Sequence, residues 1–580
     1  MRKSRFGSLF EGILSKSPDM ADKLKSMAKR SSETPQSDSA PEQVAPEEAG
    51  TKKPPAKKQP IDRMANVVVE KKSITPRVRV KPNKSKPVRK PTKKNKRPKT
   101  KNTIPGGSSK PAPSYPDRFF DGIPENAHQF SLNDGSQILD VVIGLDFGTS
   151  STKVVVHAPN YAGNPAFAIP FGQYAHESLD YLLPTRLTVN SDAHCSFSPE
   201  SGSSILTDIK ITLMRLPHGS VEALGETPSA ATPMTVTAAY LALVLRYVRS
   251  WFLAHKKSIF QDFKINWAVN LGLPAAIDDD PKLRETFDLV GKAAWFMSRK
   301  PGPITLNDAY RAIEDIKHSR FKEDDLPWDF ELVPEVIAEV TGYARSEFRN
   351  VGLHFLVDVG ASTLDVCAFA LRDNEGDDHF TIYTAEVALL GAQRLHQARI
   401  DGAQKATSKS AARLFDARDP LSLIPNDLTT YVPDGEVIVE GVNQANNAFA
   451  RDSGNAVHKT IWHTRKKRDP NSPRWSENLP IFVCGGARAI DLYEQAIQGV
   501  EAWVHRFIPS CPGIRIIPLP KPTSLEANIS DADYHRLAVA WGLSHESFNI
   551  GTYDRPSEID DIPPPRKVDI SDRFIGAEMT

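Results

Sequence analysis

Residues 141–156 constrain the fold more than any other stretch, because they have the pattern of two buried strands joined by a tight turn. Both apolar runs are rich in valine, and small or hydroxyl residues separate them. This pattern predicts a β-hairpin, in which Gly148 permits a positive φ or the close approach of a ligand. Backbone N–H groups in such a turn can cradle phosphate oxygens, and Asp146 at its entrance can hold a hydrated Mg²⁺. Taken alone, the stretch fits an ordinary hairpin with a serine-rich turn equally well.

A second hairpin, residues 353–370, repeats this arrangement. Asp358 ends an apolar strand, a turn of small residues comes next, and Asp365 opens the next apolar strand. Two such hairpins in one chain predict two similar lobes that face each other, each with one turn at the cleft between them. Asp146 and Asp358 from opposite lobes would position Mg²⁺ and an attacking water, and Thr363 would bond the γ-phosphate.

A third element, residues 479–490, is an apolar strand that runs into Gly485-Gly486, with a helix expected from about Ala489. Paired glycines let the backbone lie against a flat ring. Arg488 can stack on that ring or reach a phosphate. A glycine pair after a strand is weak evidence for a nucleotide site by itself. It becomes stronger evidence when it follows two phosphate hairpins in the same chain.

The rest of the folded part alternates between strand and helix patterns. Strands are expected at residues 181–189 and 264–273, and helices at about 235–256 and 281–298. This alternation is typical of α/β proteins.

The ordered segments DFGTSSTK, DVGASTLD and VCGGARAI resemble the phosphate-one, phosphate-two and adenosine motifs of the actin, heat-shock-chaperone and sugar-kinase superfamily. Over residues 140–545, about 70% of the chain, the sequence is most similar to the ATPase domain of the seventy-kilodalton heat-shock chaperones. The resemblance implies an α/β, duplicated ribonuclease-H-like, actin-type ATPase with two lobes around a cleft for ATP and Mg²⁺. It implies lobe I at residues 129–348 and lobe II at 349–545, with an insert at about 400–475.

The resemblance also implies roles for individual residues. Residues 208–215 resemble the segment whose lysine helps to position the hydrolytic water, which would be Lys210; a surface lysine on a helix is the alternative. Residues 333–339 resemble the connecting segment with its acid at Glu335, although Val336 and Glu339 depart from the family pattern. The implied catalytic residues are Asp146, Lys210, Glu335, Asp358 and Thr363, with Asp146 and Asp358 holding Mg²⁺ through water. The implied nucleotide-binding residues are Gly148, Thr149, Ser150, Ser151, Lys153, Gly360, Ala361, Ser362, Asp365, Gly391, Gly485, Gly486 and Arg488.

Two departures from the family matter. The basic helix that sandwiches adenine in the chaperones has no counterpart in residues 400–474. The basic and aromatic side chains there, His458, Trp462, His463 and residues 465–468, form either an adenine shelf or a solvated face. The acidic, proline-rich tail at residues 546–580 is too short for a peptide-binding domain, which argues against a conventional chaperone.

The N-terminal part has a different composition. Between Lys52 and Lys101 there are twenty Lys or Arg residues and only two acids, which gives this segment a net charge of +18. The net charge of the whole chain is +2. Residues 31–128 are therefore expected to be a disordered basic arm. The polybasic run from Lys84 to Lys101 is either a contact for nucleic acid or anionic lipid or a solvated spacer. Residues 1–30 are either a short amphipathic helix or an unstructured tail.

Cysteine usage and hydropathy bear on location. The four scattered cysteines lack metal-ligand spacing, and three of them lie in apolar surroundings, so buried free thiols are expected rather than disulfides. No transmembrane segment is expected, because no apolar run approaches eighteen residues. Together these features predict a cytoplasmic protein.

Three functions fit the sequence. The first is a slowly hydrolysing, ATP-binding switch whose cleft closure is read by an unidentified protein partner. The second is an actin-like, filament-forming protein. The third is a small-molecule kinase of the sugar-kinase branch.

Overall fold

The computed structural model describes residues 137–175, 179–198, 202–215, 231–406, 424–432, 440–488 and 490–563. Contacts divide the chain into residues 1–105 and 106–580, and every described residue belongs to the second unit. The candidate N-terminal helix, the basic arm with its run from Lys84 to Lys101, and residues 564–580 lie outside the described residues.

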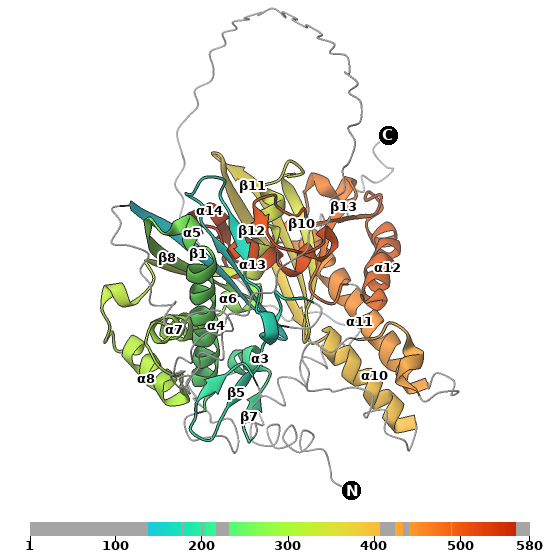
Figure 1. The fold of residues 1–580 in the computed structure, drawn as a ribbon. Helices are drawn as coiled ribbons and strands as arrows, with labels where there is room; N and C mark the ends of the chain where they lie inside the picture. The colour runs from blue at the N-terminus through green and yellow to red at the C-terminus, as the bar shows by residue number, and fades with distance from the viewer. Residues whose placement is uncertain are drawn as a thin grey trace, which may run out of the picture. The chain divides into compact units, whose positions relative to one another are not determined.

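The described part is a mixed α/β structure, and β1 (Gln137–Phe147) is central in its first large sheet (Figure 1). β1 pairs antiparallel with β2 (Ser151–His157) and parallel with β8 (Phe263–Leu273). The order is β15-β3-β2-β1-β8-β9, with β4 paired to β2. The remaining strands of this sheet are β3 (Ala166–Ala168), β4 (Leu183–Pro184), β9 (Asp329–Pro334) and β15 (Leu525–Glu526).

The second large sheet is built around β10 (Gly352–Val359). β10 pairs antiparallel with β11 (Leu364–Asn374) and parallel with β13 (Leu479–Cys484). The order is β14-β13-β10-β11-β12-β16, and the remaining strands are β12 (Asp377–Ala388), β14 (Ile514–Ile517) and β16 (Thr552–Asp554).

The two sheets share one pattern of strand order and direction. In each, a central strand has two successive antiparallel strands on one side and two parallel strands on the other, β3-β2-β1-β8-β9 in one and β12-β11-β10-β13-β14 in the other. A third, small sheet contains β5 (Leu187–Val189), β6 (Cys195–Ser196) and β7 (Ser204–Leu206).

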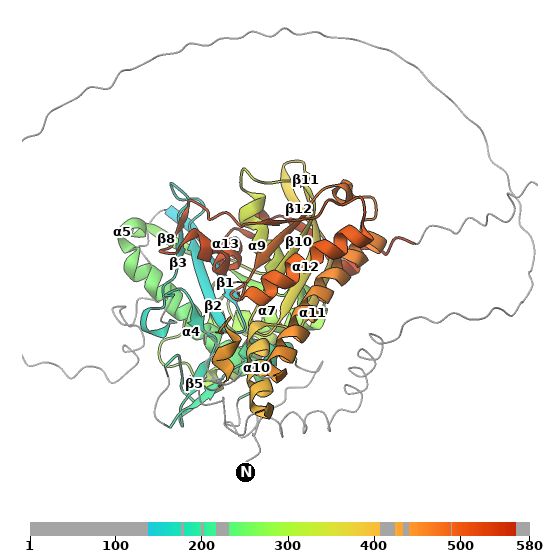
Figure 2. The same cartoon turned by 90° about the vertical axis from the view of Figure 1, so that its right-hand side faces the viewer.

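The longer helices pack beside these strands. α4 (Pro233–His255) packs against α7 (Pro281–Ser298) and α8 (Leu306–Lys317), and α11 (Glu440–His463) packs against α10 (Ala392–Ala406) and α12 (Asp491–Phe507). The first group is labelled in Figure 1, and the second is labelled in both Figure 1 and Figure 2. The shorter helices are α3 (Ile209–Met214), α5 (Lys257–Phe260), α6 (Ala275–Asp278), α9 (Glu335–Ala344), α13 (Ala538–Leu543) and α14 (Ser547–Ile550).

Sequence features explain where α4 begins and where it lies. Thr232 caps its N-terminus in a capping box with Thr235, and Pro233 occupies the first turn, where proline costs no hydrogen bond. Among the described residues it is the one helix long and apolar enough to cross a membrane, but 94% of its apolar window is buried inside the protein. It therefore has the character of a core helix.

Two short helices connect the large sheets. α9 and α13 pack against each other, and their core also contains Val155 of the first sheet and Phe369 and Phe482 of the second. A Cβ atom on Gly542 would lie 1.8 Å from the carbonyl oxygen of Ala338, so the helices cross at backbone contact. Glycine is required there by close approach.

Several expected elements are confirmed. Both hairpins form as antiparallel pairs, the helices near 235–256 and 281–298 are α4 and α7, and the strand at 264–273 is β8. All four cysteines are free and buried. The continuous strand expected at 181–189 is wrong, because Thr185 and Arg186 separate β4, which joins the first sheet, from β5 in the small sheet. The segment expected as a tail from residue 546 contributes α14 and β16.

A buried histidine pair ties β2 to the end of α13. The rings of His157 and His545 lie 4.9 Å apart at a steep angle. Nδ1 of His157 lies 3.1 Å from the carbonyl oxygen of Ser544, so that nitrogen must donate, and Nε2 has no partner within the described structure. Burial lowers the pKa of His157 to about 4 and that of His545 well below its usual value. Both rings are therefore neutral in the folded state.

We expect acid to destabilise the fold through this pair. Between about pH 6.5 and pH 4 the unfolded chain binds a proton at His157 that the folded chain does not, so the free energy of unfolding falls as pH falls. The substitution His157→Gln should reduce the slope of unfolding free energy against pH by roughly 1 kcal/mol per pH unit. Urea titrations at pH 7, 6 and 5 measure the slope, with the exposed His505→Gln as control. Identical slopes for the wild type and His157→Gln would contradict this interpretation.

Candidate functional site

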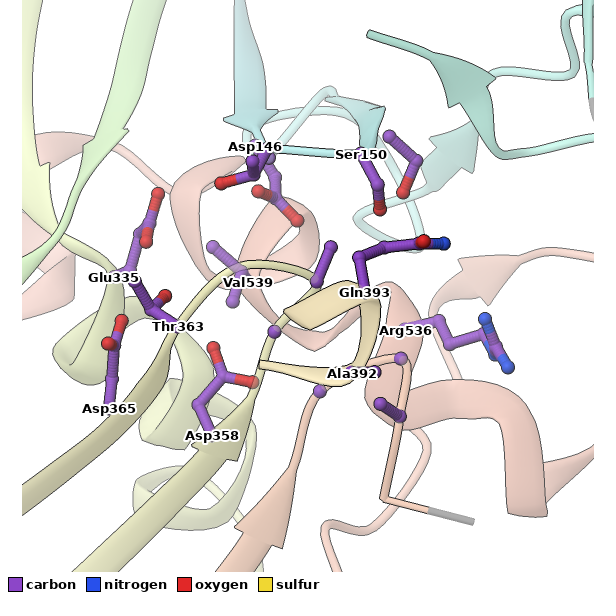
Figure 3. A pocket seen from close by; sticks show the side chains of 18 of the residues that line it. Asp146, Ser150, Glu335, Asp358, Thr363, Asp365, Ala392, Gln393, Arg536 and Val539 are labelled. Carbon is purple, nitrogen blue, oxygen red and sulfur yellow. The ribbon is translucent and has the colours of Figure 1, made fainter. Parts of the chain in front are cut away.

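The cavity between the two large sheets has a volume of about 310 Å³ and is lined by both hairpin turns (Figure 3). Asp146 and Asp358 project toward it from opposite sides, and Glu335, Thr363 and Asp365 lie together at one end. The predicted residues that line the cavity are Asp146, Gly148, Thr149, Ser150, Ser151, Lys153, Lys210, Glu335, Asp358, Gly360, Ala361, Thr363, Asp365, Gly485 and Gly486. Ser362, Gly391 and Arg488 are not among its lining residues.

The two turns have similar local geometry. A Cβ on Gly148 would lie 2.3 Å from the carbonyl oxygen of Ser151, and one on Gly360 would lie 3.2 Å from that of Thr363. In both turns the absent side chain leaves room for the carbonyl three residues later. Each turn can therefore close tightly while its backbone borders the cavity.

A network of hydrogen-bonded hydroxyl groups supports the first turn. The Thr185 hydroxyl donates to the carbonyl oxygen of Gly148 at 2.9 Å, and Tyr240 donates to Thr152 at 2.9 Å. The hydroxyl oxygens of Thr152 and Thr185 lie 3.1 Å apart, and both residues are fully buried. The first turn is therefore held by side chains from three separate segments of the chain.

Gly391 and Ser362 support the second turn and do not border the cavity. The N–H of Gly391 donates to the carbonyl of Ser362 at 3.1 Å, and the next two N–H groups donate to the carbonyls of Gly360 and Ala361. A Cβ on Gly391 would lie 2.4 Å from the Thr363 nitrogen. The glycine is needed because this segment packs directly on the turn.

The cross-strand partner of the aspartate differs between the hairpins. Asp146 faces Lys153 across β1 and β2, and the two form a 2.9 Å ion pair. Asp358 faces another acid, Asp365, across β10 and β11. Burial, together with Glu335, raises the pKa of Asp358 to about 6. Burial and Asp358 raise the pKa of Asp365 to about 8.

This acidic end of the cavity fits a hydrated divalent cation. One carboxylate oxygen of Asp358 and one of Asp365 are buried without a hydrogen-bond partner in the described structure. The described residues hold no group of three or more His, Cys, Asp or Glu side chains placed to bind a metal directly. Mg²⁺ characteristically keeps several waters and takes one or two carboxylates plus substrate phosphates. The residues therefore fit Mg²⁺ held through water rather than a closed metal cage.

Lys210 is a buried member of the site rather than a surface lysine. It is 4% exposed in α3, and its Nζ lies 2.6 Å from Oε1 of Glu335 at the start of α9. Burial alone would lower the pKa of Lys210, but the Glu335 carboxylate, with Asp146 and Asp365, raises it. Lys210 is therefore a cation at neutral pH and can donate hydrogen bonds but not accept a proton.

The glycine pair borders the cavity next to Asp358. Gly485 has φ of +84°, and a Cβ there would lie 2.1 Å from the Asp358 carboxylate. Arg488 instead donates to the carbonyl of Ala532 at 3.2 Å. Arg536 lines the cavity, with a guanidinium nitrogen 3.4 Å from where a Cβ of Gly486 would stand. The arginine that lines the cavity beside the glycine pair is therefore Arg536 and not Arg488.

Glu339 is the most unusual cavity residue to which the sequence patterns assigned no role. It lines the cavity from α9 and is 2% exposed. Burial and Asp358 raise its pKa well above the usual value, and it is hydrogen-bonded to the Cys484 side chain. The signal in the sequence was the departure from the family pattern at this position. The other polar lining residues that the sequence did not indicate are Gln393, Asn426, His535 and Arg536.

The basic and aromatic cluster of residues 458–468 does not line the cavity. It lies at the end of α11 and in the helical turn η7 (Thr464–Arg468) that continues it. The helix expected from about Ala489 is α12, which begins at Asp491.

No protein-family model matches this chain, and no curated protein matches it significantly.

Proposed function

We propose that this chain binds Mg²⁺-ATP between two lobes of a duplicated ribonuclease-H-like, actin-type fold. The repeated strand order around β1 and β10 supports the duplication. The observation that carries the proposal is the meeting of the two glycine turns, after Asp146 and Asp358, in one cavity with Gly485 and Gly486. Backbone N–H groups of two turns that border one cavity suit the oxygens of a polyphosphate.

Each part of the cavity has a role in this proposal. The turns at Gly148 and Gly360 hold the phosphates, and Lys153 and Thr363 contact them. The side of Gly486 and Arg536 receives the base, because a guanidinium can stack on an aromatic ring. Asp146 and Asp358 hold hydrated Mg²⁺, which when bound neutralises charge on the phosphate oxygens.

Slow hydrolysis is the role proposed for Lys210 and Glu335. Protonated Lys210 donates hydrogen bonds, and Glu335 is paired to it at 2.6 Å. The pair can orient a water molecule, and the lysine can stabilise charge that develops on the phosphoryl group. A small cavity of about 30 Å³ beside Glu335, Asp358 and Asp365 has room for a water molecule.

The fold suits a conformational switch. The turns belong to different sheets, which meet through α9 and α13, so a nucleotide held by both turns favours a closed arrangement. In this proposal a protein partner reads cleft closure in the cytoplasm, and the run from Lys84 to Lys101 contacts a polyanion.

The test is phosphate release from ATP in a single turnover. Lys210→Ala is expected to slow release by about 100-fold, typical of removing one preorganised donor, while ATP affinity changes by only a few-fold. Lys292→Ala, which breaks a more exposed Lys–Asp pair on α7, is the control. A rate unchanged by Lys210→Ala would overturn the assigned role of this lysine.

A further inference from the structure

Four ring side chains gather near the C-terminal ends of α11 and α12. His458 stacks on Trp503 at 4.7 Å, and Trp503 lies 5.1 Å from Phe507 and 6.1 Å from Trp462. Trp462 is 40% exposed and Phe507 is 46% exposed. Exposed apolar side chains that are grouped together often mark an interaction site, whereas single exposed ones do not.

Cations cover the same surface. Lys466 lies 4.7 Å above the ring of Trp462, and Arg506 lies 5.3 Å from that of Phe507. Neither cation forms an ion pair within the described part of the chain. We refer to these rings and cations as the aromatic–basic patch: His458, Trp462, Lys466, Trp503, Arg506 and Phe507. It suits a segment that combines apolar and acidic side chains.

The C-terminal part of this chain already reaches the edge of the patch. The Asp561 carboxylate pairs with Lys467 at 2.9 Å and Arg468 at 3.2 Å. The N–H of Ile562 donates to the carbonyl oxygen of Lys467 at 2.7 Å. The described chain ends one residue later, at Pro563, so the remaining residues are tethered next to the patch.

These remaining residues have the composition that the patch requires. Residues 568–580, VDISDRFIGAEMT, interleave five large apolar side chains with three acids and one arginine, Arg573. At about 3.3 Å per extended residue, Phe574 can lie up to roughly 36 Å from Pro563. α12 itself is only about 25 Å long at 1.5 Å per residue, so the whole patch is within reach.

We propose that residues 568–580 dock on the aromatic–basic patch of their own chain. Their apolar side chains cover Trp462 and Phe507, and their acids face Lys466 and Arg506. The inference does not depend on nucleotide binding. It makes the patch a surface that the chain itself occupies, so a partner that binds there must first displace this segment.

The test is binding of a fluorescent synthetic peptide of residues 564–580 to the full-length protein. The wild type should bind it weakly, because its own segment competes. A full-length Phe574→Asp, Ile575→Asp double variant should bind the wild-type peptide at least tenfold more tightly. Adding Trp462→Ala and Phe507→Ala should abolish this gain. Trp328→Ala, which removes a ring 46% exposed elsewhere, should preserve it.

Three results would overturn the proposal. Equal peptide affinity for the wild type and the double variant would mean that the chain's own segment does not occupy the patch. A gain that survives loss of Trp462 and Phe507 would place the segment elsewhere. Binding of a single-stranded oligonucleotide, or Trp462-dependent self-association in sedimentation, with no peptide binding would assign the patch to nucleic acid or to a second copy.

Discussion

Asparagine at position 146 or position 358 is expected to lower the rate of phosphate release at saturating Mg²⁺-ATP by at least about 100-fold. Each substitution removes a charge that would hold hydrated Mg²⁺ and leaves the shape of the side chain almost unchanged. The two aspartates come from different sheets, so each should be needed even when the other is intact. Metal-dependent charge stabilisation of several kcal/mol sets the expected size of the loss.

Phosphate release is measured for both variants at several Mg²⁺ concentrations, beside thermal melts that verify folding. Asp452→Asn is the matched control, because its carboxylate is 44% exposed and pairs only with its neighbour Arg451 among the described residues. Wild-type turnover in both the Asp146→Asn and Asp358→Asn variants would contradict the proposed metal site.

Gly542→Ala is expected to prevent stable folding or to cost more than about 3 kcal/mol of unfolding free energy. The added Cβ would stand 1.8 Å from the carbonyl oxygen of Ala338. Because the Ala338 atom belongs to the backbone, no side-chain rotation can relieve this clash. α13 would have to move away from α9, which opens the core shared by the two sheets.

Gly499→Ala is expected to change the free energy of unfolding in the opposite direction. Gly499 lies inside α12, and nothing lies within 4 Å of where its Cβ would stand. Alanine there should raise the free energy of unfolding by up to about 1 kcal/mol through helix propensity. Urea titration compares the two variants, and equal stabilities would contradict the crossing-helix interpretation.

Local patterns in the sequence predicted the parts of the site that local structure determines. The hairpins at Asp146 and Asp358 and the strand before Gly485 are each short, continuous segments of the chain. Their β-branched runs end at turn residues, and this pattern predicts a hairpin from local sequence without knowledge of tertiary contacts. The buried faces of β1 are also predicted by its continuous apolar run, which suits a strand covered on both sides.

Long-range packing determined the parts of the site that local patterns could not predict. Arg536 lines the cavity although the sequence assigned it no role, whereas Arg488 was chosen for its place after Gly485 and Gly486 and does not line the cavity. Lys210 was ambiguous because its burial depends on Glu335, 125 residues away. The break between β4 and β5 arises because Thr185 hydrogen-bonds the first turn, a contact between distant segments.

Calorimetric titration of the full-length protein with Mg²⁺-ATP tests the central claim most directly, namely that two hairpin turns jointly hold one Mg²⁺-nucleotide. We expect one site per chain, with affinity that falls at least about tenfold, or 1.4 kcal/mol, when Mg²⁺ is chelated. A similar loss is expected for Asp358→Asn. No binding at millimolar Mg²⁺-ATP, or an affinity indifferent to both Mg²⁺ and Asp358, would contradict the claim.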